Sequence, residues 1–204
     1  MARRLLIVVL VLLALLGISQ LVIPPIVEQR IEDRLTAGGG TADVSLSAFP
    51  PMRLLFDDGS RITVTGRGLD LTAASGNGEV LSNLDGYDRV AVSLDHFRAG
   101  PFALASFDLT RAGPAAPYHL VTRGRTSPTE LASFGTSQVG LPGGPLLNFL
   151  GDEVTGPENI PIHLDMNVES DGGRIVVTSG TGEIAGIPTG PLAELVTSVV
   201  AVQL

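Results

Sequence analysis

The chain has 204 residues, carries a formal net charge of −8 at pH 7 and contains no cysteine. Without cysteine there can be no disulfide, thiol nucleophile, thiolate zinc site or lipid-modified N-terminal cysteine. An acidic chain with only 4% aromatic residues is also a poor nucleic-acid binder, since that role needs cations for the phosphates and rings that stack on bases. Beyond the N-terminal segment, the length predicts one domain that is large enough to bury its own core.

The first segment is predicted to be a membrane anchor. Arg3 and Arg4 precede an apolar run of 19 residues, from Leu5 to Ile23. At about 1.5 Å per residue, a helix of this length spans about 28 Å, which matches the hydrocarbon core of a bilayer. The positive-inside rule then keeps the N-terminus in the cytoplasm. The sequence thus predicts a single-pass protein of the cytoplasmic membrane whose domain lies on the extracytoplasmic side.

A cleaved signal peptide is the competing interpretation of this segment. Gly17 and Ser19 are small residues at the spacing that cleavage before Gln20 would need. The apolar run continues to Ile23, however, which is longer than the usual hydrophobic region of a signal peptide. We therefore expect an uncleaved anchor over residues 1–23.

Residues 24–40 are predicted to form an amphipathic helix that ends in a hinge. The two prolines at 24 and 25 break or kink the membrane helix. Val27, Ile31 and Leu35 then follow at helical spacing and form one apolar stripe, while charged residues occupy the other faces. Residues 38–40 are all glycine, which ends the helix and makes the hinge.

Residues 41–204 are predicted to form one extracytoplasmic domain made mainly of strands. Apolar and polar residues alternate over segments 61–65, 89–95, 103–110 and 160–168. One-sided alternation predicts antiparallel pairing with one buried and one solvated face. Near the glycines at 66 and 68 the alternation shifts by one position, which predicts a bulge. Asp171-Gly172-Gly173 predicts a hairpin turn.

Short helices are expected to interrupt the sheet, which makes the predicted fold class α+β. Ser127-Pro128-Thr129-Glu130 combines a helix N-cap, proline at the first helical position and glutamate at the third. Near the C-terminus, Leu192 and Leu195 begin an apolar pattern at helical spacing behind Pro191. The valines there also allow a final strand over residues 200–204.

The sequence contains no recognisable catalytic motif. The nucleophile elbow, the Walker A loop and the dinucleotide-binding glycine motif are all missing. The three histidines, His96, His119 and His163, fall in strand-like segments. His163 and Asp165 share the polar face of one predicted strand and could pair on a metal, but a solvated face is the expected role. We expect no enzyme activity, no metal site and no cofactor.

An apolar cluster near the membrane is the main functional feature of the sequence. Segment 48–56 holds Phe49, Leu54, Leu55 and Phe56 between the glycine hinge and the first long strand. Because exposed patches this apolar are uncommon, one interpretation is that the cluster fills ordinary core. The functional alternative is that it forms a lip that contacts lipid. The C-terminal Leu192 and Leu195 leave the same two alternatives.

The prolines at 50 and 51 divide this cluster into two expected groups. They force an extended backbone, after which consecutive side chains of a strand point to opposite sides. We expect Phe49 and Leu54 to be structural, and Leu55 and Phe56 to lie nearer the lipid.

Several short motifs follow one another along the chain. They are IVEQRIEDRL at 26–35 after the anchor, VSLSAFP at 44–50 with Leu54 and Leu55, YDRVAVSL at 87–94, and residues 124–131. This arrangement resembles the LmeA-like phospholipid-binding family of actinobacterial cell envelopes. The chain departs from that family's motif at Ala48, where the family has Gly, and at Pro51, where it has a second Phe. The resemblance implies a curved antiparallel sheet packed on a long helix, as in tubular lipid-binding domains.

The resemblance also implies a function, and two other functions stay open beside it. It implies an anchored extracytoplasmic protein whose partners are membrane phospholipids, inositol lipids among them, with a role in envelope lipid or glycolipid assembly. One alternative is an enzyme of envelope biosynthesis that uses a carboxylate or histidine outside any known motif. The other is an anchored structural or interaction domain with a dry core.

Overall fold

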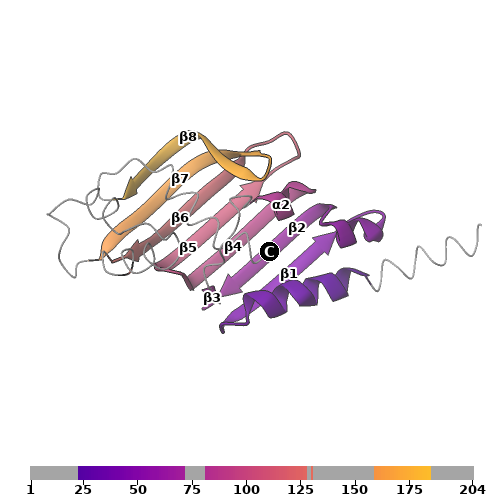
Figure 1. The fold of residues 1–204 in the computed structure, drawn as a ribbon, viewed down its shortest axis with the longest axis horizontal. Helices are drawn as coiled ribbons and strands as arrows, with labels where there is room; N and C mark the ends of the chain where they lie inside the picture. The colour runs from indigo at the N-terminus through magenta and orange to yellow at the C-terminus, as the bar shows by residue number, and fades with distance from the viewer. Residues whose placement is uncertain (1–22, 72–80, 128–129, 131–158, 185–204) are drawn as a thin grey trace, which may run out of the picture.

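The computed structural model of the chain describes residues 23–71, 81–127, 130 and 159–184. Its main feature is one eight-stranded sheet in the order β1-β2-β4-β5-β6-β7-β8, with β3 paired to β4 (Figure 1). The strands are β1 (Thr41–Ser47), β2 (Gly59–Arg67), β3 (Asp70–Leu71), β4 (Tyr87–Ala99), β5 (Phe102–Arg111), β6 (Tyr118–Thr126), β7 (Ile160–Asp171) and β8 (Arg174–Ile184). A sheet with a few helices confirms the expected α+β content.

β2 and β3 both pair with β4 in parallel, and every other strand pair of the sheet is antiparallel. The expectation of a wholly antiparallel sheet is therefore wrong at this position. A parallel pair needs a long crossover connection, and residues 68–86 supply it with β3 and the short helix α2 (Ser82–Asp85). Alternation within β2 and β4 reports which face is buried but not the direction of the strand.

The two faces of the sheet differ as the alternation predicts. The buried face is almost wholly apolar and includes Ile62, Val64, Val90, Val92, Leu94, Phe107, Leu109, Leu120, Leu164 and Met166. Each such side chain contributes about 1.5–3 kcal/mol when it is fully buried. The polar residues between them lie on the opposite face, called the solvated face below.

A helix over residues 23–35 lies beside β1 (Figure 1). Its apolar stripe is the predicted one, because Ile31 and Leu35 are buried and Val27 packs against the same core. The anchor predicted over residues 1–23 lies outside the described residues except for Ile23, and the described helix runs from Ile23 through both prolines. No helix within the described residues is long and apolar enough to cross a bilayer.

Two glutamates of this helix cover the free edge of β1. Glu28 Oε1 accepts a hydrogen bond from the Leu46 N–H at 2.7 Å. Glu32 Oε1 accepts one from the Val44 N–H at 3.0 Å. Because an edge strand with unpaired donors is a site for aggregation, the helix protects this side of the sheet.

The predicted bulge near residues 66–68 has a different form in the structure. β2 pairs with β4 as far as Arg67 opposite Asp95, and β3 resumes with Asp70 opposite Arg98, which is the same offset. Gly68 has φ 65°, and on β4 the matching detour is made by His96 with φ 47°. Because both strands depart together, the pairing register does not shift.

Two predicted local motifs are confirmed. The β7–β8 hairpin turns at Gly172 and Gly173, whose φ values of 60° and 86° suit glycine. The Glu130 N–H donates to Ser127 Oγ at 3.2 Å, and the Ser127 hydroxyl donates to Glu130 Oε2 at 3.0 Å, as in a capping pair. The C-terminal segment with Leu192 lies outside the described residues.

A polar cluster fixes α2 against the sheet. Arg111, which is only 7% exposed, donates to the Tyr118 hydroxyl at 2.9 Å and to the Asp85 carbonyl at 3.1 Å. Tyr118 Oη donates to Asp85 Oδ1 at 3.0 Å, and Ser170 Oγ donates to the other carboxylate oxygen. Burial raises the pKa of the Tyr118 hydroxyl, and the Asp85 carboxylate raises it further. Except for the buried Arg111 Nε, which has no hydrogen-bond partner among the described residues, these groups satisfy one another, so we interpret the cluster as structural.

Candidate functional site

The predicted apolar cluster forms a short 3-10 helix, η1 (Pro51–Phe56), and not a strand. Side chains three apart share a face in such a helix. Pro51 and Leu54 accordingly face inward, and Leu54 is only 1% exposed. Met52 and Leu55 face outward, each 58% exposed.

Two phenylalanines extend this exposed group. Phe49, whose peptide bond to Pro50 is cis, is 68% exposed, and Phe56 is 78% exposed. The expectation that Phe49 is structural is therefore wrong, whereas Leu54 belongs to the core and is not a candidate lipid contact. We call the four exposed side chains, Phe49, Met52, Leu55 and Phe56, the apolar lip.

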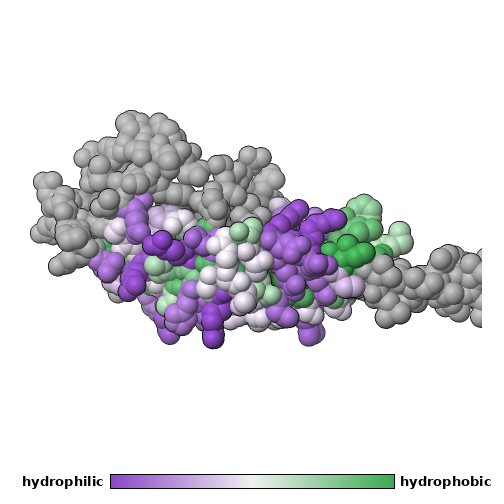
Figure 2. All heavy atoms as spheres, turned by 90° about the horizontal axis from the view of Figure 1, so that it is seen from below, coloured by the Kyte–Doolittle hydropathy of each residue, from purple (hydrophilic) through white to green (hydrophobic). Residues whose placement is uncertain are grey.

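The apolar lip lies at the end of the sheet where the helix over residues 23–35 begins. This helix runs antiparallel to β1, since Glu28 contacts Leu46 and Glu32 contacts Val44. Its first turn therefore reaches the end of β1 that leads into η1, and Ile26 adds another exposed apolar side chain there. Figure 2 shows a hydrophobic patch at this end of a largely hydrophilic surface.

An ion pair holds η1 in shape. Arg53 donates from Nε to Asp58 Oδ2 at 2.8 Å and from Nη2 to Oδ1 at 2.6 Å. These hydrogen bonds lower the pKa of the Asp58 carboxyl. Between them, Asp57 ends η1 in the left-handed conformation with φ 53°. The pair closes the turn that presents the apolar lip to solvent.

The sequence predicts this turn but not the pair that holds it. Asp57-Asp58-Gly59 is recognisable as a surface turn from its residue types. The partnership of Arg53 with Asp58 spans five residues, a spacing that no regular element favours. The ion pair can be inferred only once η1 and the left-handed conformation of Asp57 are known.

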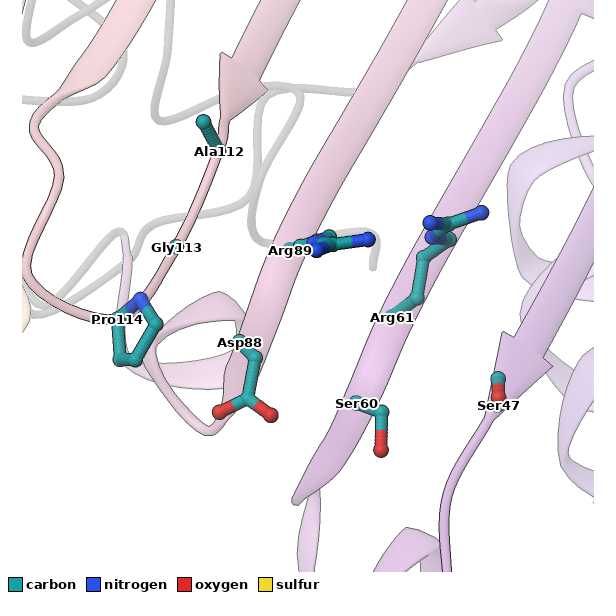
Figure 3. A pocket seen from close by; sticks show the side chains of 8 residues that line it. All are labelled: Ser47, Ser60, Arg61, Asp88, Arg89, Ala112, Gly113 and Pro114. Carbon is teal, nitrogen blue, oxygen red and sulfur yellow. The ribbon is translucent and has the colours of Figure 1, made fainter.

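An open hollow of about 630 Å³ lies on the solvated face close to the apolar lip. Arg61 and Arg89 are register partners on β2 and β4, and the Arg89 guanidinium extends towards Arg61 (Figure 3). Like charges placed opposite each other in a sheet are unfavourable unless an anion compensates them. Asp88 is the one acidic side chain among the described residues that line this lip-end hollow. The described lining residues are Ser47, Ser60, Arg61, Asp88, Arg89, Ala112, Gly113 and Pro114.

A second open hollow of about 640 Å³ lies at the other end of the strands. Among the residues that the structure describes, its lining includes three arginines and two histidines but no acidic residue. We call it the distal hollow. Its lining residues are His96, Phe97, Arg98, Ala103, Leu104, Ala105, Arg123, Gly124, Arg125, Ile162 and His163.

The histidines are placed on exposed strand positions, as the sequence predicts. His119 has its Nδ1 3.3 Å from Asn167 Oδ1 and its Nε2 3.7 Å from Asp165 Oδ1. His96 and His163 line the distal hollow. In the part of the chain that the structure describes, no three His, Cys, Asp or Glu side chains gather closely enough to hold a metal ion.

No family model, curated protein or solved structure matches this chain. Its function must therefore be argued from the geometry of its own residues and from the motifs of its sequence.

Proposed function

We propose that the chain is a membrane-anchored, extracytoplasmic phospholipid-binding protein with a role in envelope lipid or glycolipid assembly. The observation that carries this proposal is the apolar lip, which exposes four large apolar side chains within eight residues of sequence. A concentrated apolar patch of this kind marks an interaction surface more often than chance.

The position of the apolar lip favours lipid as its partner. Ile23 ends the apolar run that is predicted to be the anchor, and it is also the first described residue of the helix beside β1. Ile26 lies three residues, or about 4.5 Å of helix, further on. An anchor in the bilayer would keep this end of the sheet next to the lipid surface.

The charges near the apolar lip suit a phospholipid headgroup. Arg61 and Arg89 line the lip-end hollow together with the hydroxyl-bearing Ser47 and Ser60. Paired guanidinium groups can bind phosphate oxygens with strong, charge-assisted hydrogen bonds. We propose that acyl chains contact the apolar lip while a phosphate is held over the two arginines.

The resemblance to the LmeA-like family supports the same function. The motif that carries much of that resemblance, residues 44–50 with Leu54 and Leu55, ends β1 and forms part of η1. A segment that contributes to the resemblance thus overlaps the segment that exposes the apolar lip.

Vesicle binding by a fragment of residues 24–204 tests the proposal without the contribution of the anchor. We expect the fragment to float with phosphatidylglycerol vesicles and to carry phospholipid in native mass spectrometry. Replacing Leu55 and Phe56 together by Asp should weaken vesicle binding at least about tenfold, because each apolar side chain buried in lipid contributes about 1.5–3 kcal/mol.

The matched control replaces two exposed apolar residues outside the apolar lip. Val176 and Val177 of β8 are 45% and 38% exposed, and their joint replacement by Asp should leave vesicle binding unchanged. Circular dichroism checks that each variant is folded. A folded fragment that carries no lipid and does not bind vesicles would refute the proposal. A lip variant that binds vesicles as strongly as the unchanged fragment would also refute it.

A further inference from the structure

The distal hollow is a second concentration of positive charge that the apolar lip does not explain. It gathers Arg98, Arg123, Arg125, His96 and His163 on the surface of a chain whose formal net charge is −8. Because most surface of such a chain is expected to repel anions, a local cationic hollow is informative about a ligand.

The register of the strands explains why there is space between the arginines. Ala103 of β5 is the register partner of Arg98 on β4 and of Arg125 on β6. Adjacent strands are about 4.8 Å apart, so the two arginine backbones are about 10 Å apart with only a methyl group between them. Ala105, at the irregularity of β5, keeps the neighbouring position equally small.

A second row of side chains closes the hollow on the β7 side. Arg123 has Ser106 as its partner on β5 and His163 as its partner on β7. Arg123 and Arg125 are two residues apart on the same strand, which puts their backbones about 7 Å apart on one face. Guanidinium groups at such separations can reach different oxygens of one small anion.

The nearby acidic groups leave two of the arginines uncompensated. Arg98 has the Glu130 carboxylate at 3.6 Å and Asp70 as its register partner. Arg123 and Arg125 have no carboxylate within ion-pair distance among the residues that the structure describes. The positive charge of the distal hollow is therefore centred on β6.

Phe97, Leu104 and Ile162 also line the distal hollow, but their side chains are buried in the core. The charged side chains that a ligand can reach there are those of the arginines and histidines. A ligand that fits therefore has an anionic part for the arginines. Phosphate groups meet this description, since arginine forks bind them through two parallel N–H···O bonds.

We infer that the distal hollow binds a phosphate group, presented either by a small phosphate compound or by a phospholipid headgroup. This site is separate from the apolar lip: Arg89 and Arg98 are nine residues apart on β4, or about 30 Å along the strand. The inference does not rest on the proposed function, because the distal hollow needs no bilayer contact.

Calorimetry on the full chain in phosphatidylcholine nanodiscs tests the inference. The probes are sodium pyrophosphate, glycerol 3-phosphate and dihexanoyl phosphatidylglycerol. We expect at least one to bind, and the joint change of Arg123→Gln and Arg125→Gln to weaken that binding at least about tenfold. The matched control is Arg67→Gln with Arg174→Gln, which removes the same charge outside the hollow and should change the affinity by less than about twofold.

The three probes separate the two sources of phosphate. Binding of pyrophosphate or glycerol 3-phosphate that the hollow variant loses supports a small phosphate compound. Binding of the short-chain lipid alone, with the same loss, supports a headgroup. The inference is overturned if no probe binds the unchanged chain, or if the hollow and control variants weaken binding equally. Thermal unfolding checks both variants, and the single changes R123Q and R125Q serve if the double variant is unfolded.

Discussion

At the scale of single residues, two neighbouring leucines have opposite environments. Leu54 is 1% exposed and Leu55 is 58% exposed, although both belong to the same apolar run. The three-residue turn of η1 explains the difference, because it places Leu54 with Pro51 on the inner face and Leu55 with Met52 on the outer face.

This difference predicts unequal costs of truncation. Leu54→Ala should reduce the free energy of unfolding by about 2–5 kcal/mol, since it removes buried methyl groups and leaves a cavity. Leu55→Ala should change it by about 0.5 kcal/mol or less, because the side chain is largely in water. Urea unfolding of the two variants of the 24–204 fragment measures both values. Equal costs would mean that Leu55 is packed in solution and that the apolar lip is not free.

The same segment shows where sequence patterns stop being informative about residues. Composition identifies 48–56 as an apolar cluster near the membrane, and that prediction needs no structure. The direction of each side chain depends on the local backbone, however. A strand alternates with period two and η1 with period three, so the apolar run alone does not tell which of Leu54 and Leu55 is buried. Phe49 precedes η1, and its exposure follows from neither period.

At the scale of elements, the helix over residues 23–35 has a role beyond the burial of its apolar stripe. Glu28 and Glu32 accept hydrogen bonds from β1, so they replace the missing neighbour of the edge strand. The stripe is readable from the spacing of Val27, Ile31 and Leu35. The role of the glutamates is not, because charged residues on the remaining faces of a helix usually point to water.

Removing one of these glutamates should loosen the edge of the sheet. Glu32→Ala leaves the Val44 N–H without its charged acceptor, and we expect a loss of about 1.5–3 kcal/mol in the free energy of unfolding. Amide hydrogen exchange should accelerate at Val44 more than in the central strands. Asp33→Ala is the matched control, since Asp33 is exposed and the same charge is removed. Similar exchange at Val44 in both variants would contradict the edge-capping role.

In the sheet, too, the sequence pattern predicts the strands but not how they pair. Alternation correctly identifies strands within residues 61–65, 89–95, 103–110 and 160–168, and the hairpin glycines join β7 to β8. The parallel pairing of β2 with β4 depends on a crossover of residues 68–86, whose course no local pattern encodes. The distal hollow depends on four strands in register, so its arginines look unrelated in the sequence.

At the scale of the whole molecule, the apolar lip and the distal hollow lie at opposite ends of the strands. The proposed function puts the first of these ends at the bilayer. The chain has no tryptophan, so a single introduced indole reports its own surroundings.

We expect two tryptophan variants of the full chain to behave differently in vesicles. Phe56→Trp, in the apolar lip, should show blue-shifted emission and quenching by brominated phospholipids. Asn159→Trp, an exposed position directly before β7, should show neither effect, because it lies about 30 Å away along the strands. Equal quenching at both positions would mean that the sheet lies flat on the membrane.

The order of the strands bears on how such a chain assembles during its synthesis. Apart from β3, each strand lies beside the strand that precedes it in the chain. A newly emerged strand can therefore pair at once with the one before it, and pairing between near neighbours in sequence is fast. The helix over residues 23–35 emerges before the strands and covers the free edge of β1, so the sheet grows in one direction only. At each moment, the unpaired backbone is confined to the newest strand, which limits the time during which the half-made protein can associate with another copy.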